Sequence, residues 1–199
     1  MKQILTSFED LKSQALQCRI CEPHLPMGAN PVFRAHPSSR ILISAQAPGV
    51  RVHNSSIPFN DPSGDRLRQW MGVDTETFYD TRMISIIPMG FCYPGTGKSG
   101  DLPPRPECSK HWHKPLLAYL ESIELKIIIG QYAHQFHLAE SRSKTLTETV
   151  RNWRTFMPHT IPLPHPSPRN NIWLRKNPWF ESDVVPGLQA RIREILHKS

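Results

Sequence analysis

Short runs of apolar residues alternate along this chain with longer segments in which apolar positions recur every three or four residues. The runs have the length of buried strands, and the longer segments have the period of helices that cover a core on one side. We expect strands at 40–45, 82–87, 125–130 and 160–163. We expect helices at 8–18, 65–70, 113–123, 132–139, 146–153 and 184–197. The alternation predicts an α/β fold, a three-layer sandwich in which a four-stranded, mostly parallel sheet has helices on both faces.

Two proline-containing loops follow strands of this predicted sheet. Gln46-Ala47-Pro48-Gly49 comes directly after the first strand, and His165-Pro166-Ser167-Pro168 comes after the last. Open α/β sheets bind ligands at the carboxyl ends of their strands, so the two loops predict a pocket between them. Residues 90–107 are so rich in glycine and proline that we expect no regular element there.

The formal charge of the 199 residues is +7, which favours an acidic partner, with nucleic acid the commonest. A basic surface that serves only solubility is the alternative. The basic residues are scattered without a long run of like charge, which argues against a disordered basic tail. No segment approaches the roughly 20 apolar residues of a membrane span, and residues 1–5 show no secretory signal. We therefore expect one domain over residues 1–199, a cytoplasmic monomer with nucleic acid as its partner.

The chain has four cysteines, Cys18, Cys21, Cys92 and Cys108. In a reducing compartment such a set is more often metal-binding than disulfide-forming. Four thiolates suit a [4Fe-4S] cluster or a tetrahedral zinc ion equally, and free cysteines are a third reading.

These motifs together resemble the uracil-DNA glycosylase superfamily, most closely its iron-sulfur branch (families 4 and 5). The resemblance extends from about Cys18 to Trp179. It rests on the loop 46–49 with the pair Pro58-Phe59, on His165-Pro166-Ser167, and on the proline-rich segment from Cys92 to Cys108.

The resemblance implies hydrolysis of the N-glycosidic bond of uracil or a related deaminated base that is flipped out of DNA. It favours a structural [4Fe-4S] cluster on the four cysteines over zinc. The motifs contain no lysine placed to form a Schiff base, so we expect a monofunctional glycosylase that does not cut the strand.

By the same resemblance, His165 donates a hydrogen bond to the departing base, and Phe59 stacks on it. Gln46 and Ala47 contact the base, and Pro48 and Gly49 allow the backbone to approach it. Each has a structural alternative: a satisfied histidine, a core phenylalanine or a simple tight turn.

Two departures from the family pattern affect the chemistry. Ala47 stands where the best-known branch has a water-activating aspartate, and the asparagine that usually reads uracil is missing from the region of Ser85 and Pro88. We assign Ser85 to base binding. Asp61 is expected to orient water or to stabilise a cationic sugar. Asp65 is an equal alternative for this role, and either residue would also suit a helix cap.

Residues of the loop that contains His165 are expected to contact DNA. Ser167, Arg169 and Asn170 lie close to the flipped base in relatives, and Ile172 or an asparagine could fill the vacated stack. For Trp173 and Trp179 we prefer packing against the last helix. The competing functions are a DNA-binding or base-sensing module that has lost catalysis and a zinc-stabilised nucleic-acid adaptor.

Overall fold

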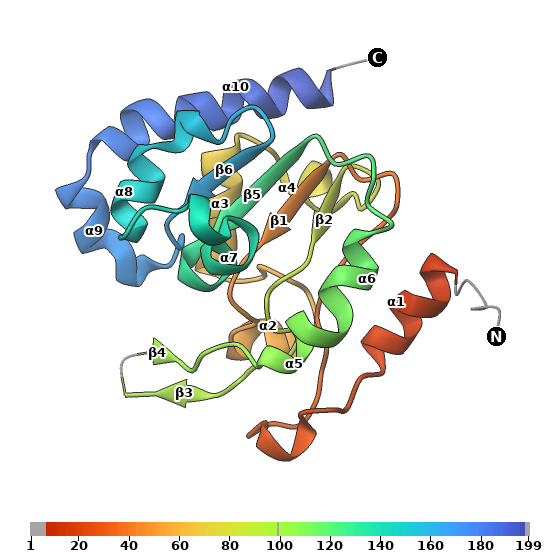
Figure 1. Ribbon diagram of the computed structural model, residues 1–199. Helices are drawn as coiled ribbons and strands as arrows, with labels where there is room; N and C mark the ends of the chain where they lie inside the picture. Colours follow the sequence, from red (N-terminus) through yellow and green to blue (C-terminus); the bar gives the residue numbers. More distant parts are fainter. Residues whose placement is uncertain (1–6, 99, 198–199) are drawn as a thin grey trace.

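A computed structural model of the protein describes residues 7–98 and 100–197, which leaves the expectation for residues 1–5 outside the described part. Its central sheet has four parallel strands in the order β2-β1-β5-β6, as Figure 1 shows. The strands are β1 (Ile41–Ser44), β2 (Ile84–Ile86), β5 (Leu125–Ile129) and β6 (Thr160–Leu163). The predicted strands and the predicted sheet are confirmed.

The sheet is buried on both faces, which explains why its strands read as continuous apolar runs rather than alternating ones. In β1 and β2 every residue is buried, and in β5 only Lys126 is exposed. β6 contains Pro162, which an edge strand tolerates because one side of its backbone needs no partner.

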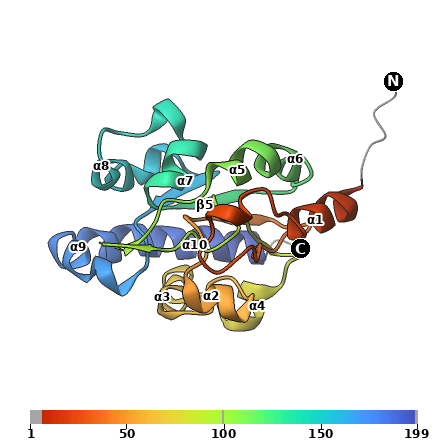
Figure 2. The ribbon, with the colours of Figure 1, turned by 90° about the horizontal axis from the view of Figure 1, so that it is seen from below.

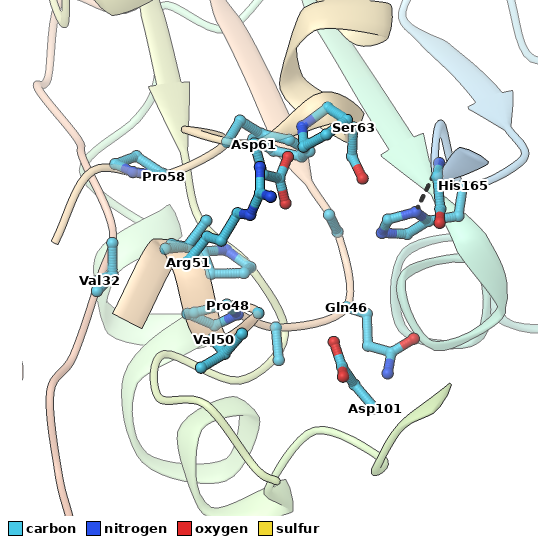
Figure 3. Close-up of a pocket in the computed structure, with 18 of the residues that line it drawn as sticks. Val32, Gln46, Pro48, Val50, Arg51, Pro58, Asp61, Ser63, Asp101 and His165 are labelled. Carbon is cyan, nitrogen blue, oxygen red and sulfur yellow. Dashed lines mark hydrogen bonds between the residues drawn. The ribbon is translucent and has the colours of Figure 1, made fainter. Parts of the chain in front are cut away.

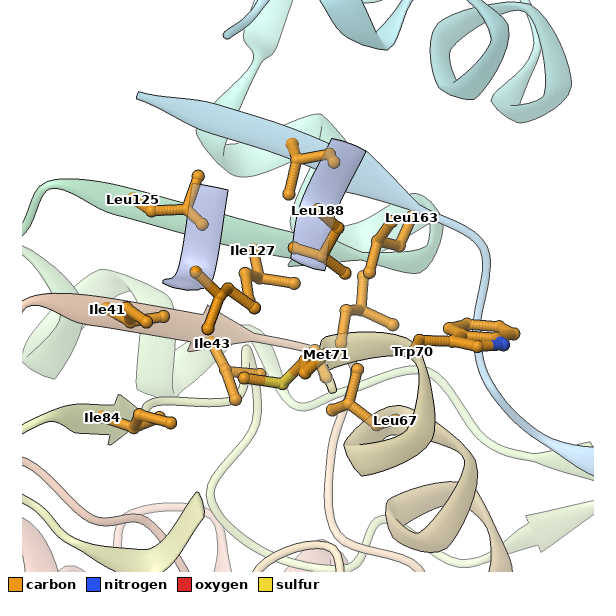
Figure 4. Packing of buried hydrophobic residues seen from close by; sticks show 14 of the residues in the cluster. Ile41, Ile43, Leu67, Trp70, Met71, Ile84, Leu125, Ile127, Leu163 and Leu188 are labelled. Atoms are coloured by element: carbon orange, nitrogen blue, oxygen red, sulfur yellow. The ribbon is translucent and has the colours of Figure 1, made fainter. Parts of the chain in front are cut away.

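Helices cover both faces, which completes the three layers (Figures 1 and 2). Figure 4 shows Leu67 and Met71 of α3 and Leu188 of α10 close to Ile43 and Ile127 of the sheet. The opposite face carries α1 and α6, whose Phe8, Ala15 and Leu116 share a second core cluster with Leu42 of β1.

The helices are α1 (Phe8–Leu16), α2 (Val50–Ser55), α3 (Pro62–Met71), α4 (Thr75–Tyr79), α5 (Pro106–Cys108), α6 (Lys114–Leu117), α7 (Gly130–His137), α8 (Leu146–Arg151), α9 (Asn171–Lys176) and α10 (Val185–Leu196). Single helical turns lie at Glu22–His24, Ser109–His113, Ala139–Ser141, Trp153–Thr155, Pro168–Asn170 and Phe180–Val184. Within the described residues, no helix is long and apolar enough to cross a membrane.

The expectation for residues 90–107 was wrong. The segment contains a two-stranded antiparallel ribbon, β3 (Thr96–Gly97) paired with β4 (Gly100–Asp101), and then α5. Glycine favours this ribbon, because Gly95 and Gly100 adopt φ angles of 104° and 143° that other residues rarely reach. Proline is compatible with α5, because Pro106 occupies its first turn, where no backbone donor is needed.

Candidate active site

A cavity of about 570 Å³ opens at the carboxyl ends of β1 and β6. Most of its lining comes from four segments: the loop after β1 with the start of α2, the turn before α3, the loop after β6, and β4. Val32, Ile86 and Pro88 complete the lining. The structure thus brings both proline-containing loops to one cavity, as their positions after parallel strands predict.

His165 reaches into this cavity from the loop after β6 (Figure 3). The backbone N–H of Ser167 donates to His165 Nδ1 at 3.2 Å, which leaves the proton of the neutral ring on Nε2. Burial lowers the pKa of His165, and the negative charges of Asp61 and Asp101 oppose this shift only in part. At neutral pH the side chain is therefore an uncharged donor.

The loop around His165 is held by its neighbours. Asn170 Nδ2 donates to the His165 carbonyl at 2.7 Å, and Arg66 donates to the Ser167 carbonyl at 3.2 Å. Arg66 also donates to Asn171 Oδ1 at 2.8 Å, so one arginine of α3 ties this loop to the other side of the cavity. Ser167, Arg169 and Asn170 all line the cavity, as expected for residues placed near DNA.

The loop after β1 lines the cavity with Gln46, Ala47, Pro48 and Gly49, all of them predicted site residues. Gln46 Nε2 donates to the Leu102 carbonyl at 3.1 Å, and the Gln46 carbonyl accepts from a backbone N–H in the segment after β2. Gln46 is thus partly committed to fixing the proline-rich segment, and its side-chain oxygen remains to contact a ligand.

Phe59 lines the cavity and also belongs to the main core cluster, so the core alternative is confirmed and stacking on the base stays a prediction. Its ring packs edge-on against Phe78 at 6.1 Å, and its backbone has a φ of 57°, unusual for a residue other than glycine. Gly64 makes this conformation possible, because a Cβ at residue 64 would lie 1.8 Å from the Phe59 carbonyl oxygen. The first turn of α3 therefore packs directly against the backbone of Phe59.

Asp61 lines the cavity and caps α3, because its Oδ1 accepts the Gly64 N–H at 2.9 Å. The cap predicted as an alternative is confirmed, and the catalytic role stays a prediction. Asp65 is turned to solvent, where it pairs with Arg68 at 2.6 Å. Only Asp61 of the two contributes a carboxylate to the cavity.

Ser85 does not reach the cavity, which disagrees with its assignment to base binding. Side chains alternate between the faces of a strand, so Ile86 lines the cavity while Ser85 points to the other face. There Ser85 is fully buried, with its Oγ 2.6 Å from Ser39 Oγ. Pro88, beyond the strand end, reaches the cavity instead.

Sequence reasoning missed Asp101, Arg51 and Ser63, which also line the cavity. Asp101 belongs to β4, and its Oδ2 lies 3.5 Å from the position that a Cβ on Gly49 would occupy. The only available signal was an acidic residue inside a proline-rich segment of a basic protein.

Trp173 has the packing role that the sequence favours. Its ring lies 5.8 Å from Trp179 and 5.7 Å from Phe180, and its Nε1–H donates to Thr147 Oγ1 at 2.8 Å. Ile172 beside it is 59% exposed, which leaves it available to a partner.

The four cysteines form no disulfide. Cys21 and Cys92 share a small buried cluster with Leu25, and the Phe91 N–H lies 3.4 Å from Cys108 Sγ. Burial raises the pKa of Cys92 to about 11 and of Cys108 to about 12, and the charges of the other cysteines add to both shifts. Among the described residues, however, no group of three or more cysteine, histidine or acidic side chains is arranged to hold a metal ion.

Comparison with known families gives a match over residues 33–189 to the Uracil DNA glycosylase superfamily. The match covers most of the chain and includes all segments that line the cavity except Val32. The chain belongs to this superfamily, a group of hydrolytic glycosylases that act on DNA.

Proposed function

We propose that the protein is a monofunctional DNA glycosylase that removes uracil or a related deaminated base by hydrolysis. The observation that carries the proposal is His165, a half-buried neutral imidazole whose Nε2–H faces a cavity that Phe59 and a carboxylate also line. A neutral donor suits a base that leaves as an anion, because the hydrogen bond strengthens as negative charge develops.

In the proposed reaction the flipped base lies against Phe59. The bond between C1′ of the sugar and the base nitrogen breaks, its electron pair leaves with the base, and His165 Nε2–H stabilises the resulting charge. The oxygen of a water molecule bonds to C1′, and the proton that it loses passes to a carboxylate and then to solvent. Asp61 suits this last role, because its Oδ2 makes no hydrogen bond to the described residues.

The lesion is best determined with labelled oligonucleotides that carry uracil, hypoxanthine, xanthine or thymine opposite guanine, each tested for abasic sites. We expect release of at least one deaminated base and no release of thymine. A panel without any abasic product would reject the glycosylase and leave the second candidate, a base-binding module. The observation that favours this candidate is Pro88, a side chain without hydrogen-bonding groups, at the cavity edge where an asparagine is usual.

We also propose that Cys18, Cys21, Cys92 and Cys108 hold a [4Fe-4S] cluster with a structural role. All four are thiols, the donors that such a cluster takes, and the charges of Cys18 and Cys21 act on both Cys92 and Cys108. Burial makes the thiolates of Cys21, Cys92 and Cys108 costly, and a metal centre would compensate that cost. A bound cluster would tie the segment after α1 to α5.

Purified protein is expected to be brown with broad visible absorbance, and Cys108→Ser should lose that absorbance. Ser109→Ala, a change at the next residue, is the control that should keep it. Colourless wild-type protein with one zinc ion per chain would contradict the cluster and support the adaptor reading.

A further inference from the structure

Asp101 places a second carboxylate in the cavity, from an element outside the sheet. It lies on β4, whose partner strand β3 contributes a weak hydrogen bond from Thr96 Oγ1 to Asp101 Oδ1 at 3.4 Å. Figure 3 shows the side chain of Asp101 directed toward the cavity, beside Gln46 and on the side of the cavity away from Asp61.

The ribbon is fixed at this place by contacts to both strand-end loops. Gln46 donates to the Leu102 carbonyl, and the Arg169 guanidinium lies so close to Gly100 that a Cβ there would be 2.6 Å from its Nη1. The Leu102 N–H donates to the Gly95 carbonyl at 2.8 Å. Asp101 therefore sits between the loop of Gln46 and the loop of His165.

The charge of Asp101 is not neutralised by the protein. Among the described residues, three aspartates pair with arginine, Asp65 with Arg68, Asp80 with Arg82 and Asp183 with Arg154. Asp61 and Asp74 instead cap helices through backbone N–H groups. Within residues 7–98 and 100–197, Asp101 forms no ion pair.

An unpaired carboxylate on a face that receives DNA repels the phosphates, so it weakens binding. Such a charge is useful where positive charge develops, and the sugar in glycoside hydrolysis becomes cationic in the transition state. The side chain of Asp101 faces the same cavity as His165, so one cavity offers a donor for the anionic base and a carboxylate for the cationic sugar.

We propose that Asp101 is a catalytic residue that stabilises the positive charge on the deoxyribose while the glycosidic bond breaks. The inference rests on the proposed function. Asp101 forms no covalent bond and takes no proton in this role. The electron pair of the broken bond leaves with the base, and the carboxylate opposes the charge left on the sugar until water adds.

The first test is the single-turnover rate of base release. Asp101→Asn keeps the shape of the side chain and removes its charge, and it should slow release about tenfold to a hundredfold, less than the loss of a fully buried donor. Asp101→Glu keeps the charge and should recover part of the rate. Asp65→Asn, which removes an exposed carboxylate outside the cavity, is the control that should leave the rate unchanged.

The second test measures binding only. DNA that carries a cationic pyrrolidine in place of the sugar is compared with DNA that carries neutral tetrahydrofuran at the same position. Wild type should bind the cationic analogue more tightly, by about tenfold, and Asp101→Asn should lose most of this preference, because the attraction between the two charges is removed.

The outcomes separate the inference from the proposed function. If wild type and Asp101→Asn release base at equal rates and share the same preference for the cationic analogue, the inference is wrong and the glycosylase stands. If wild type releases no base but prefers the cationic analogue through Asp101, the role of the carboxylate holds and the proposed activity fails. Equal binding of both analogues by wild type would also overturn the inference.

Discussion

Two of the walls of the cavity differ in construction. One wall consists of the loops that continue β1 and β6, and the strands below it are buried on both faces. The other wall is the ribbon of β3 and β4, which lies outside the sheet and is held by Gln46 and Arg169. The packed core fixes the position of the strand-end wall, whereas the position of the ribbon depends on a few contacts at the cavity edge.

The two walls also differ in what they present to a ligand. The strand-end wall presents backbone and an uncharged His165, whose low pKa follows from burial. The ribbon presents an ionisable carboxylate near solvent. The comparison indicates that a sheet edge can position a desolvated neutral donor, while an appended ribbon can add charge without burying it in the core.

Removing the imidazole of His165, which belongs to the strand-end wall, should have the largest effect on base release. His165→Ala should reduce the single-turnover rate of base release by about two to three orders of magnitude, on the scale of one lost oxyanion-type donor. Affinity for uncleavable DNA should change much less, because the interaction strengthens only as charge develops. His159→Ala, an exposed histidine before β6, is the control. Equal losses in rate and affinity would mark His165 as a ground-state contact.

Disturbing the turn before α3 should have the next largest effect. In Gly64→Ala the new Cβ would meet the Phe59 carbonyl oxygen, so the turn must move or the helix must shift. We expect a loss of about 1–3 kcal/mol in the free energy of unfolding, measured with urea, together with slower base release. Gln69→Ala, at an exposed position of the same helix, should change neither. Wild-type stability in Gly64→Ala would show that Phe59 is not confined by α3.

Acid should destabilise the protein through His113, which contacts the segment after β2. This buried side chain has its Nε2 3.0 Å from the Pro88 carbonyl, and burial lowers its pKa to about 4 from 6.5. At a pH between these two pKa values, His113 is protonated in the unfolded chain and neutral in the folded protein. The free energy of unfolding therefore decreases as the pH decreases. From pH 7 to pH 5 this group should account for about 2 kcal/mol.

The measurement is urea unfolding at pH 7 and pH 5 for wild type and two variants. His113→Gln should reduce the stability difference between the two pH values, whereas His111→Gln, an exposed neighbour, should not. The same difference in wild type and His113→Gln would assign the acid sensitivity to other groups.

Removing the Arg169 side chain, which contacts Gly100 of the ribbon, should have the smallest effect. Arg169→Ala should weaken DNA binding several-fold for all sequences alike and reduce the slope of log affinity against log salt by about 0.9, the value of one phosphate contact. Arg154→Ala, whose guanidinium pairs with Asp183, is the matched control. An unchanged slope in Arg169→Ala would mean that Arg169 only braces the ribbon.

The sequence predicts the strand-end wall well, for a physical reason. Buried parallel strands are continuous apolar runs, and ligands lie beyond their carboxyl ends, so 46–49 and 165–168 could be placed together. The ribbon could not be predicted, because its position depends on contacts between residues far apart in the chain, such as the Gln46 side chain with the Leu102 carbonyl. Asp101 was missed for the same reason.

Two further differences come from geometry that a linear pattern does not carry. Ser85 was assigned to the base because it lies near a family position, but strand alternation turns it to the other face. Phe59 owes its place to a positive φ and to close contact with Gly64, neither of which periodicity indicates.

The most direct test of the central claim is a product balance for wild-type protein on DNA that carries one uracil. A monofunctional glycosylase should yield one free uracil for each abasic site, in a strand that stays intact until alkali or heat is applied. Free base should be measured by mass spectrometry and intact strand by a gel of the same samples. Absence of free base, from uracil and from each other deaminated base, or strand cleavage that accompanies release, would contradict the account.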